Sequence, residues 1–277
     1  MKMRFLVFTD LDGTLLDHDT YAFAPATEAL AKLAREEIPV VINTSKTFEE
    51  VRVWRDRLGL ATPFIVENGS ALVIPNKFET GTADTALPGA TLKDGFRWLE
   101  FGASLDEIRA GLRAINEHRQ FKYRGFSEIS ARELAALTGL GEREARDAKA
   151  RLYSEPVLWG DDESALSAFT EELKTRHLTA VRGGRFVHIM GATDKGAALR
   201  ETARWFAALY DAQITTIALG DSPNDCEMLE AADIAVIVNN RNSPTLSIAG
   251  TRSLYTKAEG PSGWQEAFDE LFHSDIR

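Results

Sequence analysis

Two hydrophobic patterns alternate in the first and last thirds of the sequence. Short runs of consecutive apolar residues, typical of strands buried on both faces of a sheet, alternate with segments whose apolar residues lie three or four positions apart, as in amphipathic helices. The predicted strands are residues 4–9, 38–42, 64–66, 216–219 and 234–238. Thr47 and Glu50 have the spacing of a capping box at a helix start. These elements predict an α/β fold, with a doubly wound, mostly parallel, Rossmann-like sheet covered by helices on both faces.

The middle of the sequence follows a different plan, in which strands and helices do not alternate regularly. Strands are predicted at 96–101 and 153–159, and a hairpin at 178–190 turns at Gly183 and Gly184. Helices are predicted from Ser104 to about residue 118, after Ser130, over 142–152 and over 163–177. We therefore expect an α+β domain at 87–190, inserted into an α/β core formed by 1–86 and 191–277.

Composition and charge restrict the class of protein. The 277 residues suit two domains, and the net charge of −10 argues against broad nucleic-acid binding. Residues 87–190 hold 16 basic and 16 acidic side chains, so the flanking segments carry the whole −10. No apolar run is long enough to span a membrane, and the N-terminus lacks a secretory pattern, so a cytoplasmic protein is expected. The single cysteine, Cys226, excludes an internal disulfide and a cysteine-built zinc site.

Asp10 and Asp12 follow the first predicted strand, where open α/β sheets bind their ligands. Residues two apart in an extended segment point to the same side, so the two carboxylates are expected to converge. Adjacent carboxylates repel each other unless a cation or a proton separates them, and oxygen ligands suit Mg²⁺. An aspartate is also a known nucleophile toward phosphoryl groups. The alternative is a simple turn, because Asp12 precedes Gly13.

The segment Asp10-Leu-Asp-Gly-Thr14 resembles the first motif of the haloacid dehalogenase superfamily of phosphatases. The resemblance implies that Asp10 attacks phosphorus and that Asp12 is the general acid and base. It also implies Mg²⁺ as the cofactor, bound by Asp10 and by the backbone carbonyl of Asp12.

Three further motifs match the family in the expected order. In residues 43–47, Thr44 fits the family's phosphate-binding hydroxyl, and Ser45 and Lys46 add a donor and a charge; helix capping is the alternative. Lys195 matches the lysine that neutralises nucleophile and phosphate, the alternative being an exposed helical lysine. Asp221 and Asp225 match the family's fourth motif, which implies that they complete the metal site. Asp225 also suits a helix start.

The insertion lies where the superfamily places a type 2 cap, whose members usually act on small phosphorylated metabolites. Six segments narrow the resemblance further: 44–47 and 64–69 in the core, and 124–129, 137–140, 151–156 and 183–188 in the cap. Together they resemble the mannosyl-3-phosphoglycerate phosphatase branch across nearly the whole chain, and this branch yields the compatible solute mannosylglycerate. This resemblance implies a sugar–glycerate phosphate as substrate. Five cap residues are candidates for binding its carboxylate and sugar hydroxyls: Arg151, Ser154, Glu155, Arg185 and His188.

Each cap candidate has a structural alternative. Arg151 can be a solvated helix charge with Glu155 as its ion-pair partner, Arg185 can protect a strand edge, and His188 can face solvent. Three other activities stay open: hydrolysis of a related ester such as glucosyl-3-phosphoglycerate or sucrose phosphate, phosphomutase chemistry, and non-catalytic sensing of a sugar phosphate. Retention of both Asp10 and Asp12 argues against the sensor.

Overall fold

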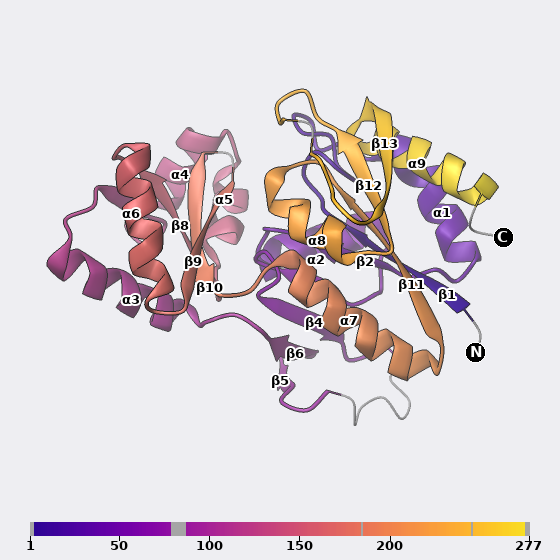
Figure 1. The fold of residues 1–277 in the computed structure, drawn as a ribbon, viewed down its shortest axis with the longest axis horizontal. Coiled ribbons are helices and arrows are strands. Elements are labelled where there is room, and N and C mark those ends of the chain that lie inside the picture. The colour runs from indigo at the N-terminus through magenta and orange to yellow at the C-terminus, as the bar shows by residue number, and fades with distance from the viewer. Residues whose placement is uncertain (1–2, 79–86, 184, 245, 275–277) are drawn as a thin grey trace.

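The computed structural model describes residues 3–78, 87–183, 185–244 and 246–274. The chain forms two units that lie side by side, connected by the segments 101–104 and 192–194 (Figure 1). Gly184, one of the two glycines expected at the hairpin turn, lies outside the described residues. No helix in the described ranges is long and apolar enough to cross a membrane.

The larger unit, called the core here, contains a nine-stranded sheet in the described part of the chain, in the order β13-β12-β11-β1-β2-β3-β4-β6-β5. The first six strands in this order are parallel, and the last three add antiparallel pairs. The strands are β1 (Met3–Thr9), β2 (Val40–Asn43), β3 (Phe64–Val66), β4 (Ala71–Pro75), β5 (Thr91–Lys93), β6 (Phe96–Glu100), β11 (Gln213–Gly220), β12 (Ile234–Asn239) and β13 (Arg252–Glu259).

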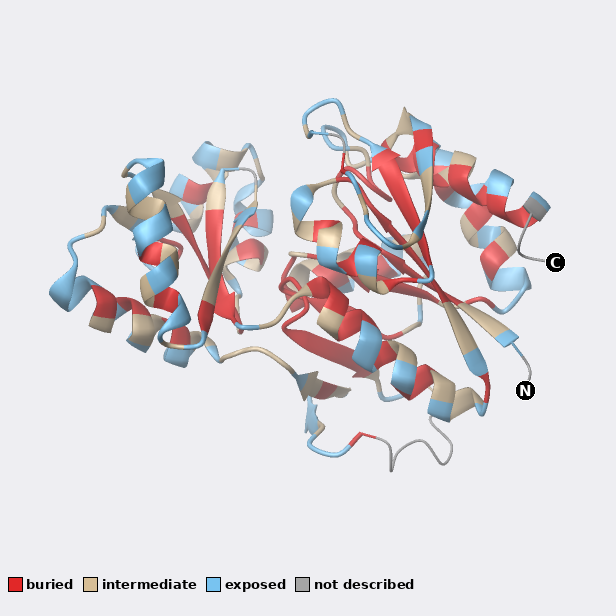
Figure 2. Ribbon diagram, viewed as in Figure 1, coloured by how far each residue is buried: buried red, intermediate tan, exposed pale blue. Residues whose placement is uncertain are grey.

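Helices cover both faces of this sheet, as the apolar strands require. Side chains alternate along β1, so Val7 packs on one face, with α1, α2 and α9, while Leu6 and Phe8 pack on the other, with α7 and α8. Figure 2 shows the resulting buried strands. The core helices are η1 (Ala24–Ala26), α1 (Thr27–Arg35), α2 (Phe48–Leu58), α7 (Lys195–Tyr210), η3 (Pro223–Asp225), α8 (Cys226–Ala231) and α9 (Gly260–Ser274).

The smaller unit, called the cap, is built on an antiparallel sheet in the order β7-β8-β10-β9. Val187 and Ile189 of β10 pack against α3 and α6, and Phe186 of the same strand packs with α4 and α5 on the opposite face. The cap elements are α3 (Leu105–His118), β7 (Tyr123–Gly125), α4 (Ala131–Thr138), α5 (Glu142–Lys149), β8 (Ser154–Trp159), α6 (Glu163–Lys174), β9 (Leu178–Gly183) and β10 (Phe186–Gly191).

The predicted fold class is confirmed, and the structure corrects three boundaries. Strands β5 and β6 pair within the core sheet, so the cap begins after Glu100 and not at residue 87. Helix α5 ends at Lys149, before the expected residue 152, because residues 151–154 leave the helix and contact the core. Helix α6 ends at Lys174, before the expected residue 177.

Candidate active site

The site lies where parallel strands of the core sheet end. Thr9, the last residue of β1, pairs with Leu219 of β11 and with Ile42 of β2. The residues just beyond these strands, Asp10, Asp221 and Thr44, therefore meet at one edge of the sheet. All three are buried. The strand register thus brings together groups that lie far apart in the sequence.

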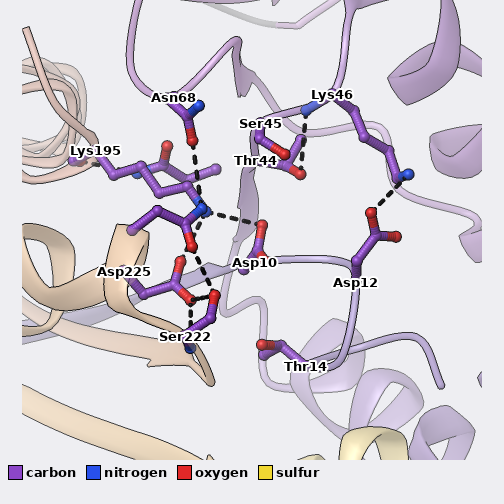
Figure 3. Close-up of polar contacts among 12 residues, drawn as sticks. Asp10, Asp12, Thr14, Thr44, Ser45, Lys46, Asn68, Lys195, Ser222 and Asp225 are labelled. Atoms are coloured by element: carbon purple, nitrogen blue, oxygen red, sulfur yellow. Dashed lines mark hydrogen bonds and ion pairs between the residues drawn. The ribbon is translucent and has the colours of Figure 1, made fainter. Parts of the chain in front are cut away.

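Lys195 stands at the centre of the buried charges (Figure 3). Its Nζ atom lies 2.9 Å from Oδ1 of Asp10 and 2.7 Å from Oδ1 of Asp225. Burial by itself lowers the pKa of Lys195, but the two carboxylates outweigh that effect and raise it. The ammonium group therefore stays charged at neutral pH. The alternative that Lys195 is an exposed helical lysine is wrong, because its side chain is fully enclosed.

Asp225 is held by the chain around it. Its Oδ2 atom accepts hydrogen bonds from the backbone N–H groups of Asp221 and Ser222, each at 3.1 Å. The Ser222 hydroxyl donates to the same oxygen at 3.2 Å. Asp225 also occupies position N3 of a capping box whose N-cap is Ser222, so the helix-start interpretation is confirmed. With Lys195 on its other oxygen, Asp225 is well placed to hold that lysine in position.

Asp221 is fixed by two donors from other segments. The Thr14 hydroxyl donates to Oδ1 of Asp221, and Nδ2 of Asn240 donates to Oδ2, both at 2.6 Å. Gly13 passes close beside it: a Cβ atom at Gly13 would lie 2.6 Å from Oδ2 of Asp221, and its φ of +76° also favours glycine. The turn predicted at Asp12 and Gly13 therefore belongs to the site itself.

Three carboxylates form a potential metal site. One oxygen each from Asp10, Asp221 and Asp225 lie within 4.8 Å of one another, and all three residues are buried. Burial raises the pKa of Asp221 to about 8, and repulsion from Asp225 and Asp10 adds to this. Among the described residues that these carboxylates contact, Lys195 is the only cation. A hard divalent ion with oxygen ligands fits the remaining negative charge.

Asp12 points away from this cluster (Figure 3). Its Oδ2 atom lies 2.8 Å from Nζ of Lys46, which is 3.7 Å from Oε1 of Glu50. The pKa of Asp12 is raised above its usual value, because burial, together with the charge of Asp10, outweighs the opposite effect of Lys46. The expected convergence of the two aspartate side chains is therefore wrong: the chain has already turned at Asp12. Both residues nevertheless line one cavity.

The loop after β2 combines the two interpretations given for it. Thr47 caps α2 through the predicted capping box with Glu50, while the residues before it face the site. The Thr44 hydroxyl accepts from the backbone N–H of Lys46 at 3.5 Å. Lys46 is buried, and the charges of Asp12 and Glu50 outweigh the effect of burial and raise its pKa. Ser45 lines two adjoining cavities.

These two cavities lie between the core and the cap. The larger has a volume of about 600 Å³ and includes Asp10, Asp221 and Arg182 in its lining. The smaller, of about 180 Å³, is lined by polar groups of the core and by apolar side chains of the cap, Phe126 and Phe186 among them. Asp12, Ser45 and His188 line both cavities. The space open to a ligand therefore branches near the carboxylate cluster.

His188 is the cap candidate that reaches both cavities. It is buried, and its Nδ1 atom has no hydrogen-bond partner among the described residues. Burial lowers the pKa of His188 to about 3, and the charges of Arg151 and Lys195 act in the same direction. The imidazole is therefore neutral, with an unpaired ring nitrogen beside the ligand space. The alternative that it faces solvent is wrong.

Arg151 and Ser154 lie where the cap meets the core. Nη1 of Arg151 donates to the backbone carbonyl of Ser45 at 2.7 Å, and Arg151 also lines the smaller cavity. The Ser154 hydroxyl donates to Oε2 of Glu67 at 2.5 Å. Ser154 is fully buried in this contact and does not line either cavity.

The structure does not bring Glu155 or Arg185 to either of these two cavities. Alternation along β8 turns Glu155 to the opposite face from Ser154, where it forms an ion pair with Arg109 and lines a separate cavity of about 620 Å³. Its partner is thus Arg109, not Arg151 as the alternative proposed. Arg185 is exposed and donates to the backbone carbonyl of Leu137.

Several groups around the site were not predicted from the sequence. Thr14 and Asn240 hold Asp221, and Glu67 and Asn68 form the loop that connects the site to the cap. Asn68 accepts from Nδ2 of Asn224 at 3.4 Å. A signal was available for three of them: Thr14 closes the first motif, and Glu67 and Asn68 are polar residues directly after an apolar strand that ends at the same sheet edge.

Comparison with known proteins agrees with this geometry. The sequence matches the model of the haloacid dehalogenase-like hydrolase family over residues 7–101 and 144–260. A curated relative from Methanococcoides burtonii, named glucosyl-3-phosphoglycerate/mannosyl-3-phosphoglycerate phosphatase, is 39% identical over 271 residues, which cover 97% of each chain.

Solved structures of phosphatases share the fold. One, from Bacteroides thetaiotaomicron and described within the haloalkanoate enzyme superfamily, has a TM-score of 0.66 at 19% identity, covering 99% of this chain and 96% of its own. The sucrose-phosphatase of Synechocystis sp. PCC6803, solved with sucrose and phosphate, has a TM-score of 0.63 at 18% identity, covering 98% and 99%. At these identities the likeness establishes the two-unit architecture alone.

Proposed function

Because the chain belongs to the haloacid dehalogenase-like hydrolases and is a phosphoric monoester hydrolase, we propose that it hydrolyses mannosyl-3-phosphoglycerate to mannosylglycerate and phosphate. Glucosyl-3-phosphoglycerate is the alternative substrate. The observation that carries the proposal is the buried Asp10–Lys195–Asp225 cluster on a cavity between core and cap. The choice of substrate is supported by the 39% identical relative, whose match includes the cap.

The family generally uses a divalent metal, and we propose that this one is Mg²⁺. Asp10 and Asp221 would hold it through their carboxylates, and Asp12 through its backbone carbonyl. Asp225 would act from the outer side, since its oxygens already accept bonds from Lys195, Asp221 and Ser222. When bound, the ion neutralises negative charge on the phosphoryl group and on the nucleophile.

In the first step, a carboxylate oxygen of Asp10 attacks phosphorus, and the bond between phosphorus and the ester oxygen breaks. Asp12 gives its proton to the departing alkoxide, so that the product leaves as an alcohol. In the second step, Asp12 takes a proton from water, whose oxygen attacks the aspartyl-phosphate. The bond from phosphorus to Asp10 breaks, and both aspartates return to their starting states.

Positive charge and hydrogen-bond donors surround the expected place of the phosphate. Lys195 holds Asp10 in position and neutralises it, and the hydroxyls of Thr44 and Ser45 donate to phosphoryl oxygens. Lys46 orients Asp12 through their 2.8 Å ion pair and adds positive charge beside the transferred group. On the cap side, Arg151 and the neutral imidazole of His188 would bind the glycerate carboxylate and a sugar hydroxyl.

The proposal is tested by measuring phosphate release from mannosyl-3-phosphoglycerate, glucosyl-3-phosphoglycerate, sucrose phosphate and simple hexose phosphates, with and without Mg²⁺. We expect the highest kcat/KM on a glycosyl-phosphoglycerate and loss of activity after chelation. Asp10→Asn should lower kcat by at least about 10³-fold without unfolding the protein. A protein that binds these esters without turnover would be a sensor and would contradict the proposal.

A further inference from the structure

Beyond its two covalent connections, the cap contacts the core at a third place, centred on Glu67. This residue lies in the loop between β3 and β4 and is almost fully buried. Its Oε1 atom accepts from the backbone N–H of Leu152 at 2.8 Å. Its Oε2 atom accepts from the backbone N–H of Tyr153 at 3.1 Å and from the Ser154 hydroxyl at 2.5 Å. One core carboxylate therefore binds three consecutive cap residues.

Further hydrogen bonds connect the cap to the core beside the proposed catalytic residues. Nη1 of Arg151 donates to the carbonyl of Ser45, and the Thr47 hydroxyl donates to the carbonyl of Asp147 at 2.8 Å. The backbone N–H groups of Glu67 and its neighbour Asn68 donate to the carbonyls of Lys46 and Thr44. The Glu67 loop, the loop after β2 and the cap segment 151–154 thus form one hydrogen-bonded assembly.

The backbone conformation of Glu67 indicates that the glutamate side chain is needed at this position. Its φ is +49°, in the left-handed region that residues with a Cβ atom adopt at a cost. Glycine or asparagine would suit this backbone better, but neither reaches the amides of residues 152 and 153. Three donors converge on the side chain, and a carboxylate supplies acceptors only, whereas the amide of glutamine would turn a donor toward one of them.

We propose that Glu67 is a positioning residue that holds the cap segment 151–154 on the loop after β2 and so sets where Arg151 and His188 meet the substrate. His188 follows the same segment, because its strand β10 pairs with β8 and Met190 lies opposite Ser154. Glu67 does not touch the reacting atoms. Its effect is on substrates that need the cap, and this assignment rests on the proposed phosphatase function.

The test compares Glu67→Gln with the wild type on two substrates: the best sugar phosphate found in the substrate screen and p-nitrophenyl phosphate, which lacks the groups that the cap would bind. We expect KM for the sugar phosphate to rise about tenfold or more. The loss in kcat/KM on the aryl ester should be at least fivefold smaller. Equal losses on both substrates, or no loss on either, would overturn the proposal.

Two further variants separate positioning from folding. Glu67→Asn suits the left-handed backbone but is too short to reach the cap, so it should reproduce the substrate-dependent loss while the protein stays folded. Glu100→Gln is the matched control. Its carboxylate also accepts from the cap, through the Tyr153 hydroxyl at 2.7 Å, but it lies at an exposed position. We expect its kcat/KM to stay within twofold of the wild type on both substrates.

A measurement without substrate keeps this test apart from the proposed function. Hydrogen exchange of the backbone amides of Leu152 and Tyr153 should be at least tenfold faster in Glu67→Gln than in the wild type, with the strands of the core unchanged. Unchanged exchange at these two amides would overturn the contact itself, whatever the substrate. If the wild type does not hydrolyse glycosyl-phosphoglycerates, the proposed substrate fails, while the exchange result still decides the role of Glu67.

Discussion

The core side and the cap side of the cleft are built in different ways. On the core side, charged residues from three sequence segments meet within hydrogen-bond distance, because each follows the end of a strand or begins a helix at the same sheet edge. On the cap side, the candidate residues are distributed over four environments: the cleft, the contact with the core, a separate cavity and the exposed surface. The arrangement of the core groups thus follows from strand ends, whereas the arrangement of the cap groups depends on how a second unit is placed.

The largest difference between the two sides should appear when Lys195 is replaced. In Lys195→Met the buried carboxylates of Asp10 and Asp225 lose their cation, and we expect the free energy of unfolding to fall by about 3–5 kcal/mol at neutral pH. Urea unfolding in the absence of metal measures this. Arg204→Met, on the exposed surface of the same helix, is the control, with an expected change below about 0.5 kcal/mol. A Lys195→Met protein as stable as the wild type would mean that the cluster is not charged.

Asp221 tests the metal site on the core side. In Asp221→Asn one ligand loses its charge, and we expect the Mg²⁺ concentration for half-maximal activity to rise at least about 10–100-fold, the range typical even for losing a supporting partner of a ligand. A titration of phosphate release against Mg²⁺ gives the value, with EDTA-treated wild type as the reference. An unchanged Mg²⁺ requirement would place the metal elsewhere.

The core site was predictable because three signals agree for its residues: each lies in a family motif, the motifs follow the family order, and each lies at the end of a strand or the start of a helix. Asp10, Thr44 and Asp221 each follow an apolar run, and parallel strands bring such positions to one edge. The direction of the Asp12 side chain was not predictable, since it depends on where the chain leaves the strand. The domain boundary predicted at residue 87 was misplaced because the sequence of β6 predicts a short strand but does not indicate whether that strand joins the core sheet or the cap sheet.

The cap residues were harder to predict. The alternation of side chains along a strand shows which residues share a face of the sheet, but it does not show which face lies toward the cleft. Ser154 and Glu155 are neighbours on β8, yet one faces the core and the other faces α3. The position of Glu67 directly after an apolar strand indicates the sheet edge, but nothing in its local sequence shows that a segment 85 residues later will bind to it. Such contacts follow from the placement of the cap, which the local pattern does not encode.

On the cap side, the dependence of stability on pH tests the environment of His188. Its pKa in the folded state lies below that of an unfolded histidine, so as the pH falls below about 6.5 the unfolded chain binds a proton that the folded chain does not. The folded state should lose about 1–2 kcal/mol from this group between pH 6.5 and 5. His188→Asn should lack this loss, and His118→Asn, at an exposed helix position, serves as control. Parallel stability profiles for His188→Asn and wild type would contradict a buried neutral imidazole.

The smallest effect is expected at Arg185. Because its side chain is exposed and contacts Leu137 rather than the cleft, Arg185→Ala should leave kcat/KM on the sugar phosphate within about twofold of the wild type. Steady-state kinetics decide this, with His188→Asn measured alongside as the variant expected to raise KM. A tenfold loss in Arg185→Ala would show that the cap binds substrate through a surface other than the one assigned here.

The central claim, that Asp10 is the group that becomes phosphorylated, is tested most directly by a crystal structure with Mg²⁺ and beryllium fluoride, which mimics a phosphoryl group bound to a carboxylate. We expect beryllium bonded to a carboxylate oxygen of Asp10, with the ion between that residue and Asp221. Beryllium bonded to any other side chain, or a fluoride complex that leaves Asp10 unmodified in an otherwise occupied site, would contradict the mechanism.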